Sequence, residues 1–335
     1  MSHNYKKIGI FLFIFLIFMA GLITIQAKSY FTPVNPSDST IREIEIPQNS
    51  STAEVASILR NQGIIKNQEI FILYCRINGY DARLKAGLYN FRRNQSLAEI
   101  VDDLVAGRIV TDTVTIPEGL TLEDIGKVLE NQGFCSQEQW KDALVGDYDY
   151  SFLKDIPQRE NRLEGFLYPD TYRIRKGSTA EEIIDIMLKR FMQVWDEKFA
   201  DKARSQNMTL YQVITVASMV EREALFNSER ARIVGVMYNR LRAGMPLQVD
   251  ATVLYSLGIH KERVTYKDLE VDSPYNTYRI TGLPPGPIAS PGASSISAVL
   301  SPEKNNYYYY VAMSNGYHYF SRTYAEHLRA KNKYR

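Results

Sequence analysis

The pattern of apolar and polar positions along the chain predicts a series of amphipathic helices with a few short strands between them. Apolar residues recur at three- and four-residue spacing, the period of a helix with one buried face. The helices predicted in this way are 53–61, 97–106, 122–131 and 180–195, and short strands are predicted at 42–46 and 113–116. This mixture indicates an α+β fold.

Part of this pattern occurs twice. Ile46-Pro47 recurs as Ile116-Pro117, and Asn61-Gln62-Gly63 recurs as Asn131-Gln132-Gly133, both at an offset of 70 residues. Each copy opens with a strand and a helix that stops at a glycine suited to the position after a helix end. The first copy forms a strand-helix-helix-strand module, which resembles a LysM-type glycan-binding module in its layout.

The amino terminus contains an uncharged run long enough to cross a bilayer. Residues 8–25 carry no charge and follow Lys6 and Lys7. A basic flank is typical of the cytoplasmic side of a membrane helix. Since no convincing cleavage site follows, we expect residues 1–28 to be a cytoplasmic tail and an uncleaved transmembrane anchor. A removed signal peptide is the alternative.

The remaining chain is expected to lie outside the cytoplasm and to form three parts. Residues 29–40 are polar, contain two prolines and are predicted to be a stalk. Residues 41–112 are the predicted LysM-like α+β module. Residues 113–335 are the predicted catalytic domain, a larger mixed α/β domain that includes the second repeat copy at 113–162.

Composition narrows the classes of function. The 335 residues are 45% hydrophobic and 23% charged, which suits two or three domains with real cores. A net charge of +2 and the lack of a Lys/Arg block argue against nucleic acid as a partner. The 23 tyrosines suit a core or sugar-stacking surfaces. Two cysteines, Cys75 and Cys135, permit one disulfide without predicting it.

One predicted helix places a carboxylate on its apolar side. In the helix that begins at about Leu210, Glu221 falls roughly 30° from the centre of the apolar face, whereas Glu223 lies on the opposite face. A buried carboxylate without a cationic partner has a raised pKa, which suits a general acid near neutral pH. Glu223 is expected to be an ordinary solvated residue.

Two later segments are rich in proline, glycine and tyrosine. Residues 272–278 and 282–292 have the stiff composition of a loop that walls a cleft, although a long connector is the alternative. Further on, Asn315-Gly316 stands between two aromatic runs and predicts a β-hairpin.

Five segments together resemble the endolytic murein transglycosylase family, also called MltG or YceG-like. They are 163–172, 217–223, 239–250, 273–278 and 282–292. Their residues and their order along the chain are specific to this family. The resemblance covers nearly the whole exported region. It implies a single-pass membrane protein with a LysM-like subdomain that cuts nascent peptidoglycan strands near the membrane. It also implies that Glu221, the first glutamate of the pair, is the catalytic residue.

The resemblance further implies cleavage without water. Glu221 would protonate the oxygen between N-acetylmuramic acid and N-acetylglucosamine, and would then take the proton of the C6 hydroxyl, leaving a 1,6-anhydro end and limiting strand elongation. Asp250 would stabilise positive charge or cap a helix. The residues expected either to bind sugar or to have a structural role are Gln248, Tyr275, Asn276 and Tyr278.

No metal or other cofactor is expected, because the four histidines lack the spacing of metal ligands. The partners implied are peptidoglycan strands, the cytoplasmic membrane and peptidoglycan synthases. Two alternatives remain open at this point. The chain could be a non-catalytic glycan-binding scaffold for wall synthases, or a hydrolytic muramidase in which water reaches the intermediate.

Overall fold

The computed structural model describes residues 28–259, 261 and 264–334. The run 8–25, predicted as the anchor, lies outside these residues. Within the described ranges, no helix combines the length and the apolar character needed to span a membrane. The chain divides into two compact units. One runs to Asp112 and includes Arg173–Lys176, and the other comprises Thr113–Tyr172 and Gly177–Arg335.

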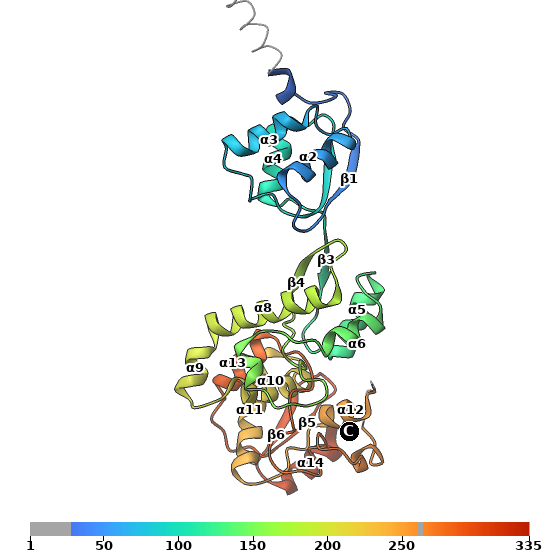
Figure 1. The fold of residues 1–335 in the computed structure, drawn as a ribbon. Helices are drawn as coiled ribbons and strands as arrows, with labels where there is room; N and C mark the ends of the chain where they lie inside the picture. The colour runs from blue at the N-terminus through green and yellow to red at the C-terminus, as the bar shows by residue number, and fades with distance from the viewer. Residues whose placement is uncertain (1–27, 260, 262–263, 335) are drawn as a thin grey trace, which may run out of the picture. The chain divides into compact units, whose positions relative to one another are not determined.

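Between residues 41 and 106, the first unit consists of a two-stranded sheet and the helices that pack on it (Figure 1). Its elements are β1 (Ile41–Ile46), α2 (Thr52–Asn61), α3 (Gln68–Ile77), β2 (Gly87–Arg92) and α4 (Leu97–Ala106). β1 and β2 are antiparallel, and Ile46 pairs with Gly87. Inward-facing residues of both strands, such as Phe91, pack with the apolar faces of the helices in one core.

The second repeat copy has the same order of elements. It consists of β3 (Thr111–Thr115), α5 (Leu122–Asn131), α6 (Gln137–Leu144), β4 (Thr171–Arg175) and α8 (Ala180–Lys198), with the short α7 (Ser151–Lys154) inserted before β4. β3 pairs with β4 as β1 pairs with β2. The first helices of the two copies start at reciprocal caps, Ser51 with Glu54 and Thr121 with Asp124, again 70 residues apart.

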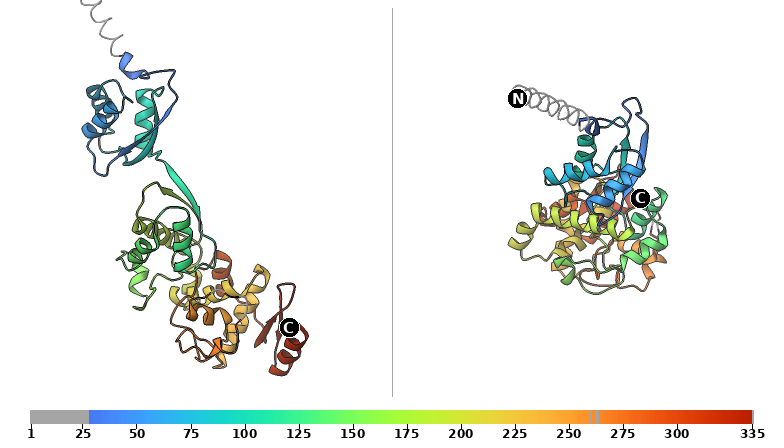
Figure 2. Two further views of the ribbon diagram at one scale, coloured as in Figure 1. Left: turned by 90° about the vertical axis from the view of Figure 1, so that its right-hand side faces the viewer. Right: turned by 45° about the horizontal axis from the view of Figure 1, so that its top comes forward.

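The rest of the second unit surrounds one central helix. Its elements are α9 (Ala200–Ser205), α10 (Leu210–Glu223), α11 (Asn227–Arg242), α12 (Asp250–Leu257), the 3₁₀ turn η1 (Asp268–Glu270), α13 (Ala293–Leu300), β5 (Tyr309–Ala312), β6 (His318–Ser321) and α14 (Tyr324–Tyr334). Helix α10 packs against α11, α12 and α13, and residues 213–220 are buried without interruption. Helix α14 covers the β5–β6 hairpin (Figure 2, left).

The structure confirms the mixed α+β fold and most predicted elements. The helices predicted at 97–106 and 122–131 have those bounds, and the hairpin around Asn315-Gly316 is present. Both cysteines are free thiols. The prediction that Asp250 caps a helix is wrong. Asp250 is the first residue of α12, and its carboxylate accepts a hydrogen bond from Tyr278 instead.

Candidate functional site

The last turn of α10 carries Glu221 and Glu223 into two different surroundings. The helix begins at a reciprocal cap between Thr209 and Gln212 and ends where Ala224 turns to an extended conformation. Residues 213–220 are buried, so α10 leaves the core at its first turn, 210–212, and again at this last turn. The neighbours of the two carboxylates therefore come from different elements.

Glu221 lies in a buried ion pair. Its side chain is 5% exposed, and its Oε1 accepts a hydrogen bond of 2.8 Å from Nη1 of Arg230, which is 8% exposed. Its Oε2 accepts a second bond, of 2.9 Å, from the backbone N–H of Gly292. The premise that this carboxylate has no cationic partner is thus wrong, because the next helix, α11, supplies one. Both carboxylate oxygens are held by fixed donors.

Glu223 is a carboxyl group with a raised pKa. It is partly buried, and its carboxylate accepts a 3.0 Å hydrogen bond from the hydroxyl of Tyr310. Burial, reinforced by the negative charge of Asp250, raises the pKa of Glu223 to about 7, although hydrogen bonds from Tyr310 and the Ala251 backbone oppose the rise. The prediction that Glu223 is an ordinary solvated residue is therefore wrong. Strand β5 and helix α12 cover the helix face that looked free in the sequence.

Glu223 borders a cavity of about 580 Å³. Tyrosines and histidines from β5, β6 and α14 form much of its wall, together with residues after α11 and around η1. The lining residues are Glu223, Arg240, Leu247, Gln248, Asp250, Val264, Thr265, Tyr266, Leu269, Tyr278, Tyr309, Tyr310, Val311, Ala312, His318, Tyr324, His327 and Lys331. Aromatic faces beside a few polar groups are typical of a site that stacks and orients sugar rings.

Three of the five predicted binding residues lie in this cavity. Asp250, Tyr278 and Gln248 all border it, and the Tyr278 hydroxyl donates to the Asp250 carboxylate. Gln248 has a positive φ of 55° and accepts a hydrogen bond from the guanidinium of Arg240. The side chain of Gln248 is therefore held in place from the helix behind it.

Tyr275 and Asn276 are placed elsewhere. Asn276 is fully buried, and its Nδ2 donates 2.9 Å bonds to the carbonyl oxygens of Leu269 and Val271. The hydroxyl of Tyr275 accepts a 2.8 Å bond from Arg159. Among the described residues, neither side chain borders the Glu223 cavity. Asn276 braces the loop that presents Tyr278.

The Pro/Gly loop 282–292 lies against α10 rather than along the Glu223 cavity. The Ile288 N–H donates 3.0 Å to the Ser218 hydroxyl, and Ser290 exchanges two 2.8 Å backbone bonds with the turn that contains Gly119. Gly292 then binds Glu221. This loop thus encloses the Glu221–Arg230 pair, and its Ile288 borders a different cavity, of about 390 Å³, so the prediction that the loop walls a cleft is confirmed for that cavity.

Sequence reasoning missed three groups at the cavity. Tyr310 contacts Glu223 directly. Arg240 is buried, and it donates to the carbonyl oxygens of Pro246 (2.8 Å) and Tyr308 (3.1 Å). His318 is held by Glu229, with 3.1 Å between Nδ1 and Oε2. The run of four tyrosines at 307–310 was the one sequence signal, since a short strand so rich in tyrosine suits a sugar-binding wall.

A comparison with protein families identifies the chain. The model of the YceG-like family matches residues 44–333. The chain belongs to the YceG-like family. The crystal structure of a YceG-like protein from Listeria monocytogenes is similar to this chain. The two sequences are 38% identical and the TM-score is 0.59, and the match covers 87% of this chain and 99% of that one.

Curated YceG-like relatives are also similar along most of their length. A Bacillus subtilis (strain 168) protein named endolytic murein transglycosylase is 36% identical over 323 residues, which are 92% of this chain and 89% of that protein. A protein of the same name from Streptococcus pneumoniae (strain D39) is 31% identical over 366 residues, 96% of this chain and 66% of the relative.

The Glu223 cavity of this YceG-like chain is suited to proton transfer. A carboxyl group with a pKa of about 7 can both donate and accept a proton near neutral pH. In the part of the chain that the structure describes, no three or more His, Cys, Asp or Glu side chains gather as a metal site would require. The raised pKa of Glu223 and the aromatic wall of its cavity favour acid–base chemistry on a bound sugar.

Proposed function

We propose that this chain is an endolytic peptidoglycan lytic transglycosylase. Two curated relatives with 31–36% identity carry the name endolytic murein transglycosylase. The observation that carries the proposal is the carboxyl group of Glu223, with a pKa of about 7, in an aromatic-walled cavity of about 580 Å³. Such a cavity accommodates a few sugar units, and its acid is protonated for a large fraction of the time at neutral pH.

We assign the acid to Glu223 in place of Glu221. Proton donation needs a carboxyl group that faces the substrate and is protonated near neutral pH. Glu221 does not border the cavity, because Arg230 and Gly292 hold both of its oxygens within the protein. Glu223 faces the cavity, and its surroundings favour the protonated form.

The proposed reaction uses one carboxyl group twice. Protonated Glu223 donates to the oxygen that links N-acetylmuramic acid to N-acetylglucosamine, and the bond from C1 of the muramyl ring to that oxygen breaks. The carboxylate then accepts the proton of the C6 hydroxyl, whose oxygen bonds to C1 and closes a 1,6-anhydro ring. Glu223 ends the cycle protonated, so no water is consumed.

The neighbours of Glu223 support both steps. The Asp250 anion raises the pKa of Glu223, and it is placed to stabilise positive charge that develops at C1. Tyr278 holds Asp250 through its hydroxyl, and Tyr310 holds Glu223. The carboxyl group is therefore oriented before substrate binds, which lowers the cost of reaching the transition state.

The proposal includes a membrane location. The uncharged run 8–25 after Lys6 and Lys7 supports a single-pass anchor with the catalytic unit outside the cytoplasm. Peptidoglycan strands near the membrane would then be within reach, and wall synthases remain the expected protein partners. Protease added to intact spheroplasts should digest residues 113–335. Protection of that region would contradict this orientation.

The decisive experiment is mass spectrometry of the products from uncross-linked glycan strands, with the full chain in detergent. Anhydro-ended fragments that disappear with Glu223→Gln and persist with Glu221→Gln would support both the reaction and the assignment. Reducing ends would indicate a hydrolytic muramidase. Strands that stay intact but are bound by every form would indicate a glycan-binding scaffold.

A further inference from the structure

A second cavity lies beside the first in the same unit. Its volume is about 390 Å³, and α5, α6, α10 and α12 border it. Arg222 and Ala251 line it, whereas their chain neighbours Glu223 and Asp250 line the first cavity. The end of α10 and the start of α12 thus contribute neighbouring residues to both cavities.

The second cavity is lined by apolar side chains and by positively charged side chains. Leu122, Leu144, Leu254, Ile259 and Ile288 provide the apolar part. The cations on the wall are Lys127, Lys141 and Arg222, against which stand the carboxyl groups of Glu123 and Glu164.

Two hydrogen-bond donors that line this cavity have no acceptor among the described residues. Lys127 is paired with Glu123 at 2.7 Å. In contrast, Lys141 has no ion pair, and the buried Nε2 of Gln137 has no hydrogen-bond acceptor, within the residues that the structure describes. An unpartnered buried donor beside a free ammonium group indicates a site for an anionic oxygen.

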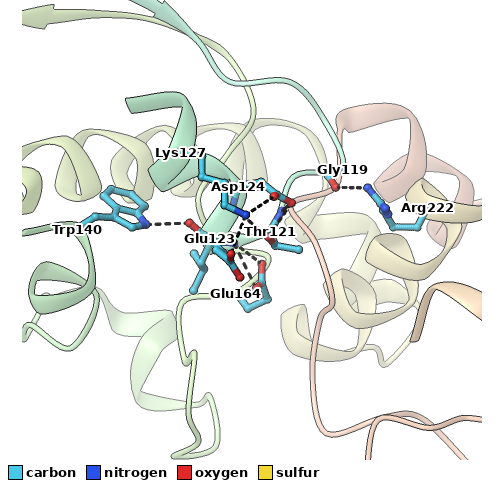
Figure 3. A network of polar contacts seen from close by, with 9 residues as sticks. Gly119, Thr121, Glu123, Asp124, Lys127, Trp140, Glu164 and Arg222 are labelled. Carbon is cyan, nitrogen blue, oxygen red and sulfur yellow. Dashed lines mark hydrogen bonds and ion pairs between the residues drawn. The ribbon is translucent and has the colours of Figure 1, made fainter. Parts of the chain in front are cut away.

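The buried carboxyl group of Glu164 does not oppose an anion there. Glu164 is 2% exposed, and it accepts bonds of 3.2 and 3.4 Å from the N–H of Leu122 at the start of α5 (Figure 3). Burial raises the pKa of Glu164 to about 8 despite the opposing effects of that N–H and of Arg159. Glu164 is therefore largely neutral at pH 7. Trp140, whose indole N–H donates 2.8 Å to the Leu122 carbonyl, closes the floor behind it.

We propose that the second cavity binds the carboxylate end of a peptide stem carried by the strand being cut. This inference rests on the proposed function. Peptidoglycan stems are short peptides with small apolar side chains and a terminal carboxylate, which match an apolar floor next to Lys141 and Gln137. A stem whose terminal carboxyl group has been consumed in a cross-link lacks this anion. The cavity would therefore favour strands with free stems.

The test measures peptide binding separately from cleavage. The full chain in detergent, carrying Glu223→Gln, is titrated calorimetrically with the pentapeptide L-Ala-γ-D-Glu-L-Lys-D-Ala-D-Ala and with its carboxy-terminal amide. We expect the acid to bind at least tenfold more tightly than the amide, since a charge-assisted hydrogen bond is lost. Adding Lys141→Glu should weaken binding of the acid by about tenfold or more, and Lys141→Ala by less.

Lys189→Glu is the matched control, because Lys189 is an exposed lysine of α8 away from the second cavity. Equal binding of acid and amide, or equal binding by the Lys141→Glu and Lys189→Glu forms, would overturn the proposal. Binding of inorganic phosphate at this site without binding of the peptide would also overturn it and indicate a phosphate ligand.

Cleavage is then compared with Glu223 restored. For Lys141→Glu, the ratio of kcat/KM on stem-bearing strands to kcat/KM on strands stripped of stems should fall about tenfold. If the acid peptide binds as expected but no strand is cut, the proposed function fails and the binding site stands. If strands are cut and this ratio is unchanged, the binding site fails alone.

Discussion

The surroundings of Glu221 and Glu223 differ sharply although only one residue separates them. Around Glu221, a buried arginine and a backbone N–H hold both oxygens. Around Glu223, a second carboxylate and a tyrosine share an open cavity. The comparison shows that burial of a carboxyl group is not enough to identify it as a catalytic general acid. The charge of the nearest partner decides whether a buried carboxyl group is a structural anion or a proton donor.

The largest effect expected is the loss of activity in Glu223→Gln. Glutamine keeps the shape and can accept from Tyr310, but it can neither donate nor accept the transferred proton. We expect kcat on glycan strands to fall by about 10³-fold, a typical contribution of general acid–base catalysis. The rate at which anhydro-ended fragments are released measures kcat. An unchanged melting temperature of the variant shows that its fold is intact. Full activity in this variant would break the comparison.

The matching change at the other carboxylate should act on stability. Glu221→Gln removes the carboxylate that is paired with the buried Arg230, and loss of one partner of a buried pair costs about 3 kcal/mol. We therefore expect a lower urea midpoint for Glu221→Gln than for Glu223→Gln. Below its melting temperature, the Glu221→Gln protein should still cut strands. A stable but inactive Glu221→Gln protein would return the catalytic role to Glu221.

Asp250→Asn tests the electrostatic part of the comparison. In the proposed mechanism Glu223 acts in its protonated form, so kcat/KM should fall as the pH rises through about 7 in the unmodified chain. The Asp250 anion raises that pKa, so its removal lowers the pKa and moves the decline to lower pH. A pH profile of kcat/KM from pH 5 to 9 measures the shift. A decline at the same pH, or one moved upward, would show that Asp250 does not act on Glu223.

The smallest effect is expected for Tyr310→Phe. The lost hydrogen bond favours the ionised form of Glu223, so its removal raises the pKa and moves the decline of kcat/KM to higher pH. The maximal rate should drop by only a few-fold, because one neutral hydrogen bond contributes about 1 kcal/mol. The opposite directions expected for Tyr310→Phe and Asp250→Asn make the pair a sharper test than either alone.

Local structure could be predicted from the sequence because its causes are local. Helix α5 has the predicted bounds, since the Thr121–Asp124 cap fixes its start and Gly133, with φ 76°, follows its end. The two strand–helix copies follow from the repeat for the same reason. In these elements the deciding contacts lie within a few residues of each other.

The proposed assignment of the acid to Glu223 could not be predicted in this way. The helical pattern of α10 shows which face is apolar, but it does not show what covers the other face. Tyr310, which contacts Glu223, is 87 positions away, and Gly292, which contacts Glu221, is 71 positions away. Arg230 lies only nine positions from Glu221, yet across a helix boundary that no periodicity describes. Tertiary contacts decide the roles of the two carboxylates.

The two copies of the repeated layout differ in what their paired helices border. In the first copy, α2 and α3 pack against each other and into their own core. In the second copy, the equivalent α5 and α6 contribute Lys127, Gln137 and Lys141 to a cavity. The same order of elements therefore encloses an apolar core in the first copy and borders a cavity in the second. Substitutions on the cavity side of α5 and α6 can change what that cavity binds while the last turn of α10, which carries Glu223, keeps its own contacts.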